Sequence, residues 1–283
     1  MRFIAYRDKA GSGLAIETKN GELRGRAGGS DLGVLVKGGA DAIASAFRTL
    51  QDAPVLDPKA ITYLPPFQAP PKIICVGLNY VDHAAESKMT PPTYPTLFTR
   101  FATSLVGHGQ PIIRPLLSEK LDYEGELVAV IGTGGRYISK ERALDHVAGY
   151  SIFNDGSIRD YQMKTPQWTV GKNFDGTGGF GPSFVTSDEL PPGAAGLRLE
   201  TKLNGQTVQS ASTTDMIFDV RSLVSIISEA ITLEAGDVIV SGTPAGVGAA
   251  RKPPLWMKNG DICEISIEGL GTLRNPIADE PAR

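Results

Sequence analysis

Apolar and polar residues alternate along most of this chain in short runs, the pattern of half-buried or buried β-strands. The strongest runs cover residues 72–80, 121–132, 150–157, 237–242 and 261–273. Asn-Gly pairs at residues 20–21 and 204–205 lie between such runs and predict β-hairpins, because Asn-Gly readily supplies the positive φ of a type I′ turn. We expect about eight strands, most of them joined by hairpin-like turns.

Three segments have the apolar spacing of helices, namely residues 39–53, 139–149 and 215–230. Many strands and few helices predict a β-rich α+β fold, a mixed β-sandwich or roll, and argue against a sheet of alternating strands and helices. The proline-dense segment 55–72 predicts a domain boundary. We therefore expect a small N-terminal α+β domain at residues 1–70 and a main domain at residues 71–283.

The composition excludes some classes of partner. Hydrophobic residues make up 41% of the 283 positions, charged residues 21%, and the formal net charge is −3, so neither nucleic acid nor a membrane is expected as a partner. The two cysteines lie in apolar runs and predict free thiols in the core, which suggests a reducing compartment. The N-terminal residues show no apolar signal core, so we expect a cytosolic location.

Several common catalytic signatures are missing. The GTGG at residues 132–135 has Tyr137 where a dinucleotide-binding loop needs its third glycine, and there is no phosphate-binding P-loop motif. Neither G-x-S-x-G nor H-E-x-x-H occurs, and three histidines are few for a zinc site. Nucleotide binding, serine hydrolysis and zinc proteolysis are therefore not expected.

The stretch LDYEGELVAVIG, residues 121–132, places three carboxylates before a strongly apolar strand. In one continuous strand Asp122, Glu124 and Glu126 would share a face with the later valines, and the opposite face is apolar too. A solvated edge is the usual interpretation of an isolated E-x-E, but burial on both faces would require a partner for each charge. Mg²⁺ favours such oxygen ligands. Asp155, at the end of the next apolar strand, is the expected third ligand, with Asp160 less well placed, although Asn-Asp-Gly is also a turn sequence.

Five motifs follow one another in the order NYVDHAAE, DYEGELVAVIG, FNDGSIRDYQ, GKNFDGTGGFGP and GDVIVSGTPAGVG. Their order and separations resemble the fumarylacetoacetate hydrolase family over about residues 70–278. The resemblance implies a roll of mixed β-sheets, usually a homodimer, whose metal ligands match Glu124, Glu126 and Asp155 here.

The resemblance also implies roles for residues outside the acidic strand. It matches a lid dyad to His83 and Glu86, a catalytic lysine to Lys172, and substrate contacts to Arg159, Gln162 and Thr243. His83 and Glu86 are three residues apart and can share one face of a short helix. The proline-rich residues 89–95 predict a mobile flap beside them. Without the family, a surface ion pair, a surface lysine and a structural arginine remain open alternatives.

We expect a metal-dependent hydrolase that cleaves a C–C bond in a 1,3-dicarbonyl acid such as an acylpyruvate or fumarylpyruvate. Its substrate would be a small 2-oxo acid in aromatic or organic-acid catabolism, and Mg²⁺, Mn²⁺ or Ca²⁺ would stabilise the enolate that leaves. Decarboxylation of oxaloacetate, or isomerisation or hydration of an oxo-dienoate, would use the same site. A non-catalytic binding protein of this fold is a further alternative, favoured by a missing lid base or a broken E-x-E, and the sequence has both features intact.

Overall fold

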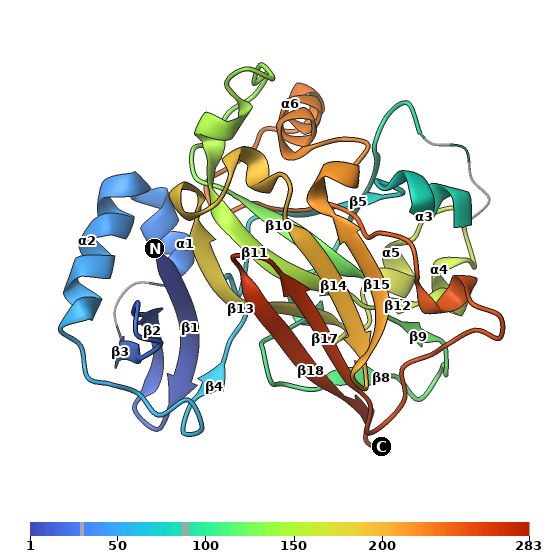
Figure 1. Ribbon diagram of the computed structural model, residues 1–283, viewed down its shortest axis with the longest axis horizontal. Coiled ribbons are helices and arrows are strands. Elements are labelled where there is room, and N and C mark those ends of the chain that lie inside the picture. The colour runs from blue at the N-terminus through green and yellow to red at the C-terminus, as the bar shows by residue number, and fades with distance from the viewer. Residues whose placement is uncertain (29–30, 87–89, 91, 283) are drawn as a thin grey trace.

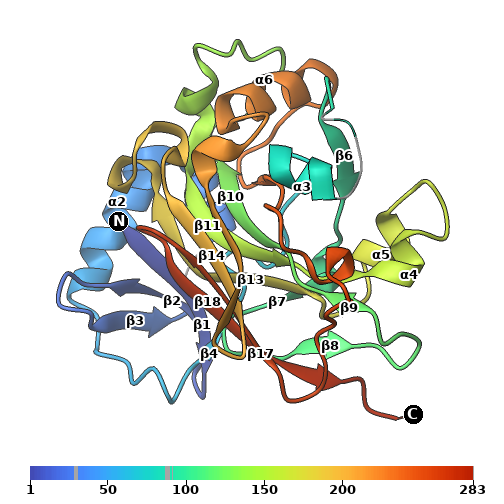
Figure 2. The same ribbon diagram turned by 45° about the vertical axis from the view of Figure 1, so that its right-hand side comes forward.

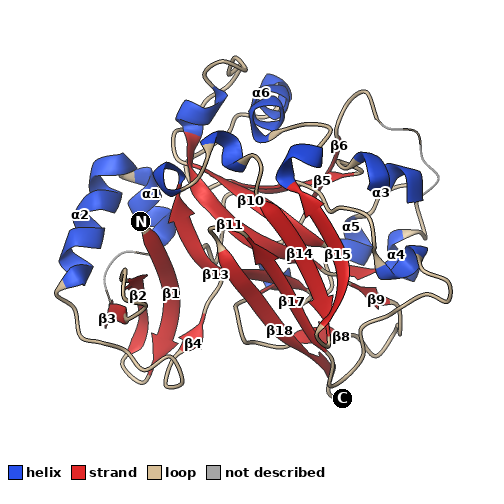
Figure 3. Ribbon diagram, viewed as in Figure 1, coloured by secondary structure: helices blue, strands red, loops and turns tan. Residues whose placement is uncertain are grey.

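The fold is dominated by two packed β-sheets, as Figure 3 shows by colour. The computed structural model describes residues 1–28, 31–86, 90 and 92–282. The larger sheet has eleven strands, nine of them in the order β3 (Leu23–Ala27), β2 (Gly11–Glu17), β1 (Arg2–Asp8), β13 (Gly178–Thr186), β11 (Val147–Asp155), β10 (Gly125–Ile131), β16 (Val238–Val240), β5 (Ile73–Gly77) and β6 (Thr96–Thr99). Strand β4 (Thr62–Tyr63) pairs with β1, and β7 (Leu105–Val106) pairs with β13.

The second sheet has five strands and covers one face of the first. Its order is β15 (Gln206–Ser212), β14 (Arg198–Leu203), β17 (Ile262–Ile267), β18 (Gly271–Asp279) and β8 (Ile112–Arg114). A separate two-stranded ribbon pairs β9 (Leu121–Asp122) with β12 (Ser157–Ile158). The fold is therefore β-rich and mixed, as the sequence predicts.

Helices lie at the two ends of the large sheet. Helices α1 (Leu32–Lys37) and α2 (Gly39–Gln51) flank the N-terminal strands, and α6 (Val220–Ala230) lies near the top of Figure 1. The short helices α3 (Val81–Glu86), α4 (Arg159–Gln162) and α5 (Thr169–Lys172) gather at the opposite end, as Figures 1 and 2 both show. Among the described helices, none combines the length and apolar character needed to cross a bilayer.

Strand β10 is buried on both faces by two different sets of side chains. Leu127 and Ala129 belong to the core between the two sheets. Val128 and Val130 belong to a second core, which includes Phe3 and other side chains from the N-terminal strands and helices. The predicted two-sided burial is confirmed. Even-numbered residues of β10 therefore face away from the five-stranded sheet.

Most predicted elements are present, with some corrections. The helix at residues 39–53 is α2, and the one at 215–230 is α6, which starts later because the Asp219 side chain caps it. The helix predicted at 139–149 is wrong: a 3-10 turn, Ala143–His146, leads directly into β11, whose pairing with β10 and β13 outweighs local helical spacing.

Both predicted hairpins form, with different turns. Asn204 and Gly205 both have positive φ, as a type I′ turn requires, whereas at the first hairpin only Gly21 does. The two cysteines are free and buried, as expected. The predicted division at residue 70 stays a prediction, and the large sheet continues across it because β1 pairs with β13.

Gly125, between the two glutamates, packs closely against the five-stranded sheet. A Cβ there would lie 2.3 Å from Thr201 Oγ1 and 3.1 Å from Ile265 Cγ2 in the five-stranded sheet. The side chains on either side of Gly125 therefore point away from that sheet, and only glycine fits between them.

We expect Gly125→Ala to lower the free energy of unfolding by about 1–3 kcal/mol, because overpacking forces the sheets apart. Urea denaturation measures this. The control is Gly33→Ala in α1, where only Asp31 Oδ1, at 3.2 Å, lies within 4 Å of an added Cβ. That change should leave stability equal or raise it by up to about 1 kcal/mol. Equal effects of the two substitutions would contradict the close approach.

Candidate metal centre and active site

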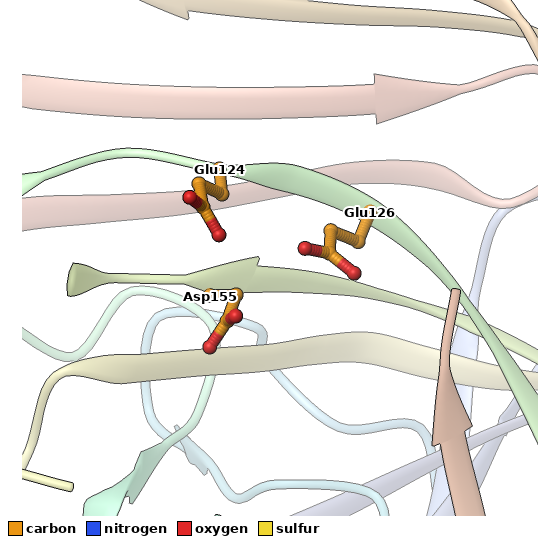
Figure 4. Close-up of side chains that lie close together, drawn as sticks. All are labelled: Glu124, Glu126 and Asp155. Carbon is orange, nitrogen blue, oxygen red and sulfur yellow. The ribbon is translucent and has the colours of Figure 1, made fainter. Parts of the chain in front are cut away.

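Three buried carboxylates converge at one end of β10 and β11. Glu124 directly precedes β10, Glu126 lies within it, and Asp155 ends β11. The antiparallel register pairs Gly125 with Asn154, and the Asp155 amide donates to the Glu124 carbonyl at 2.9 Å. Each of the three residues offers a carboxylate oxygen within 4.8 Å of the others, and Figure 4 shows the three side chains close together on neighbouring parts of the chain. The structure therefore brings together the three residues predicted as metal ligands.

Three cationic side chains surround the carboxylates. Lys172 Nζ lies 2.6 Å from Glu124 Oε2 and 2.7 Å from Asp155 Oδ2. Arg100 Nη1 donates to Asp155 Oδ1 at 2.5 Å. Arg159 Nη2 lies 2.7 Å from Glu124 Oε1, an ion pair whose angle does not make it a hydrogen bond. Burial lowers the pKa of Lys172, but Asp155 and Glu124 outweigh it and raise the pKa overall. The two carboxylates therefore favour the cationic form of Lys172.

The two glutamates differ because the cations are unevenly placed. Burial raises the pKa of Glu124, but Lys172 and Arg159 outweigh it and lower the pKa to about 2. Glu126 accepts a hydrogen bond from the Gly242 amide at 2.5 Å, and no lysine or arginine of the described chain forms an ion pair with it. Burial, Asp155 and Glu124 raise its pKa well above the usual value. One negative charge of the cluster is therefore left without a cationic partner.

The donor set fits a divalent metal ion. Hard cations such as Mg²⁺, Mn²⁺ and Ca²⁺ bind carboxylate oxygens, and this cluster offers three in a buried position. Glu126, the carboxyl group of the triad without a cationic partner, is where an added cation would be most favourable. Glu124, Glu126 and Asp155 would hold the ion, and the residues present do not distinguish among the three metals.

His83 and Glu86 form the predicted pair in helix α3. His83 Nδ1 lies 2.8 Å from Glu86 Oε1, and His83 is buried. Burial raises the pKa of Glu86, but hydrogen bonds from His83 and the Gly246 amide outweigh it, so the pKa is lowered. An ionised carboxylate only accepts hydrogen bonds, so Nδ1 carries the hydrogen and Nε2 is left with a lone pair. The flap predicted at residues 89–95 lies partly outside the described residues.

A cavity of about 310 Å³ joins the base to the carboxylates. It is lined by His83, Glu86, Glu124, Glu126, Arg159, Gln162, Lys172 and Thr243, together with a mainly apolar wall of Val76, Gly77, Leu78, Phe98, Met163, Trp168, Val247, Ala249 and Ala250. Of the residues predicted for the site, all but Asp155 line the cavity, and Asp155 lies behind Lys172 and Glu124.

The residues predicted to contact substrate form hydrogen bonds with other residues of the protein. Arg159 Nη1 donates to Gln162 Oε1 at 2.9 Å. Thr243 Oγ1 donates to the Gly125 carbonyl at 3.1 Å and accepts from Gln209 Nε2 at 2.8 Å. Their roles toward substrate stay predictions.

Sequence reasoning missed two buried residues that hold the cluster. Arg100 is 3% exposed, and its guanidinium also contacts the Gly156 carbonyl and Thr177 Oγ1. Gln209 accepts from the Gly125 amide at 3.0 Å and fixes the peptide between the two glutamates. A lone arginine inside the apolar run LFTRF is the one signal in the sequence that points to Arg100.

Asp122 and Asp160 lie outside the triad. Asp122 belongs to β9, which is separated from β10, so the single continuous strand expected for residues 121–132 is wrong. Asp160 Oδ1 accepts a hydrogen bond from Ser118 Oγ at 2.6 Å. The preference for Asp155 over Asp160 thus agrees with their positions.

Comparison with known proteins identifies the family. Residues 72–278 match the family model described as the fumarylacetoacetate (FAA) hydrolase C-terminal domain. The chain belongs to the fumarylacetoacetate hydrolase family. A solved structure of a fumarylacetoacetate hydrolase from Exiguobacterium antarcticum is 38% identical, with a TM-score of 0.86 over 99% of this chain and 100% of that one. The predicted fold and the resemblance are confirmed.

Curated relatives in the fumarylacetoacetate hydrolase family carry more specific names. An oxaloacetate tautomerase of Xenopus laevis is 43% identical over 79% of this chain and 70% of its own, and one of Homo sapiens is 41% identical over 79% and 72%. Both are described as mitochondrial. The cytosolic location expected for this chain therefore stays a prediction.

We expect Glu126→Ala to weaken Mn²⁺ binding by at least about tenfold, because it removes an oxygen ligand at the position where the cluster lacks a positive charge. Isothermal titration with metal-free protein measures the affinity. The matched control is Asp160→Asn, a nearby carboxylate outside the triad, which should bind Mn²⁺ like the unmodified protein. Equal affinity of all three proteins would exclude this metal site.

Proposed function

We propose that this member of the fumarylacetoacetate hydrolase family catalyses proton transfer at the carbon beside the ketone of a small 2-oxo acid, with tautomerisation of oxaloacetate as the first candidate reaction. The observation that carries the proposal is that the His83–Glu86 pair lines the same cavity as the glutamates of the carboxylate triad. Relatives 41–43% identical that are named oxaloacetate tautomerases support the choice of substrate.

The charges of the site would favour an anionic substrate once a divalent ion is bound. Arg159 and Lys172 line the cavity, but both are paired with protein carboxylates. A divalent ion held by Glu124, Glu126 and Asp155 would supply Lewis acidity that acidifies the C–H beside the ketone and stabilises negative charge on the ketone oxygen. It would also bring the excess of positive charge that a carboxylate-bearing substrate needs.

The base is His83. Its Nδ1–H donates to Glu86, which orients the ring and stabilises the imidazolium that forms. When the enol forms, Nε2 takes the proton from the carbon and the ketone oxygen takes a proton from solvent. In the reverse direction the oxygen releases its proton and Nε2 returns one to the carbon. Lys172, held as a cation by two carboxylates, stabilises the negative charge that develops in between.

A second candidate is hydrolysis of the C–C bond of an acylpyruvate, with Mg²⁺, Mn²⁺ or Ca²⁺ as the metal. The apolar wall of the cavity favours this reaction, because it could accommodate an acyl group. In this wall Phe98 and Trp168 contact each other edge to face, with their ring centroids 5.5 Å apart. His83 would then take a proton from water, which attacks the distal carbonyl. Decarboxylation and oxo-dienoate isomerisation also pass through an enolate, and two mycobacterial structural neighbours are named as isomerases. We also propose, from the family resemblance, that this protein forms a homodimer.

We expect the protein to accelerate loss of the enol of oxaloacetate when Mg²⁺ or Mn²⁺ is present, followed by its ultraviolet absorbance against a no-enzyme control. EDTA should abolish the acceleration and added metal should restore it, because the carboxylate triad alone leaves the enolate unstabilised. Pyruvate release from acetylpyruvate, coupled to lactate dehydrogenase, tests the second candidate in parallel. Turnover that EDTA leaves unchanged would exclude a metal-dependent mechanism.

We expect His83→Ala to lower kcat for tautomerisation and for acylpyruvate hydrolysis by about 10²–10⁴-fold, the range for loss of a general base. Any decarboxylation of oxaloacetate should persist, because breaking the C–CO₂ bond removes no proton. Mn²⁺ affinity should stay within about threefold, since His83 is not a ligand. Loss of all three activities together, with unchanged metal binding, would contradict the assignment of His83 as a base.

A further inference from the structure

Residues 246–249, the sequence GVGA, form a loop that two carboxylates hold from opposite sides. Glu86 Oε2 accepts from the Gly246 amide at 2.9 Å on the side of helix α3. Asp122 Oδ1 accepts from the Gly248 amide at 2.8 Å, and Oδ2 from the Ala249 amide at 2.9 Å. The loop therefore connects the partner of the catalytic base to the short strand β9.

Asp122 also holds the metal side of the cavity. Its Oδ2 accepts from Arg159 Nε at 2.8 Å, and the same guanidinium lies 2.7 Å from Glu124 through Nη2. A further bond comes from the Tyr123 amide at 2.9 Å, and the side chain of Asp122 has no exposure to solvent. The carboxylate thus accepts four hydrogen bonds, which uses its full capacity.

The loop has little freedom to move independently of Asp122. A Cβ on Gly246 would lie 2.1 Å from the Val208 carbonyl oxygen, and one on Gly248 would lie 1.8 Å from the Leu255 carbonyl oxygen. Tyr123 Oη donates to the Gly246 carbonyl at 3.0 Å. The position of the Gly246 amide, which donates to Glu86, is therefore set by close packing and by the hydrogen bonds that Asp122 accepts from the loop.

We propose that Asp122 is a positioning residue that couples the two halves of the site, fixing through the 246–249 loop where Glu86 holds His83 and through the guanidinium where Arg159 meets Glu124. The inference rests on the proposed function, because it assigns Asp122 a task in the proton transfer. Asp122 itself contacts no reacting atom.

The substitution Asp122→Asn separates this role from simple burial. An amide oxygen at the Oδ1 position can still accept from the Tyr123 and Gly248 amides. The NH₂ group at the Oδ2 position would face Arg159 Nε and the Ala249 amide, and all of these groups are donors. Asp122→Asn therefore removes at once the hydrogen bond from the Ala249 amide and the one from the Arg159 guanidinium.

The test is a double-mutant cycle of Asp122→Asn with Glu86→Gln, read in kcat for the proton transfer. We expect each single variant to lower kcat by about tenfold or more, and the double variant to fall within about threefold of the slower single one, because both changes displace the same base. Asp122→Asn should also raise KM, since it releases Arg159, whereas Glu86→Gln should leave KM nearly unchanged. If the loss of kcat in the double variant equals the product of the two single losses, the coupling is overturned.

The control and the alternative outcomes keep the test decisive. Asp237→Asn makes the same change at a buried aspartate that accepts the Glu234 amide and pairs with Lys72, outside the cavity lining, so it should lower stability and leave kcat unchanged. If Asp122→Asn does not fold, Ala249→Pro replaces it, because it deletes one amide donor and leaves the Asp122–Arg159 ion pair. No turnover by the unmodified protein would overturn the proposed function and this inference with it, whereas turnover with multiplying losses overturns the inference alone.

Discussion

The burial of more negative than positive charge at one end of β10 and β11 is the constraint on which the site depends. Antiparallel pairing holds Glu124, Glu126 and Asp155 together whether or not their charges are balanced, and the packed sheets exclude the water that would otherwise solvate them. Lys172, Arg100 and Arg159 neutralise Glu124, Asp155 and neighbouring Asp122 but not Glu126. Either a proton or an added cation must complete the balance, and the donor set of the cluster fits a divalent cation.

The His83–Glu86 pair is supported differently from the carboxylate triad. His83 and Glu86 lie on a short helix, not on the rigid sheet, and their position is secured by backbone amides of the 246–249 loop. The carboxylates, held by the sheet, and the His83–Glu86 pair, held by the loop, nevertheless line the same cavity of about 310 Å³. Asp122 contacts the supports of both, namely Arg159 and the 246–249 loop.

The same arrangement explains why members of one family carry names for different reactions. Tautomerisation, decarboxylation, isomerisation and C–C hydrolysis of 2-oxo acids all pass through an enolate, so the groups that stabilise negative charge can stay the same. What must differ is the distal wall and whether a water molecule reaches the base. Here that wall is mainly apolar, with Phe98 and Trp168 at its centre.

Sequence alone predicted the β-rich fold from the alternation along its strands, and it predicted the carboxylate triad and the His83–Glu86 pair from local spacing together with the family resemblance. It did not predict Arg100, Gln209 or the role of Asp122, whose long-range contacts at the site join residues 34 to 127 positions apart. It also predicted a helix at 139–149, where pairing with distant strands decided otherwise. Charge balance and hydrogen-bond partners are properties of side chains brought together by folding, so only the tertiary structure could decide them.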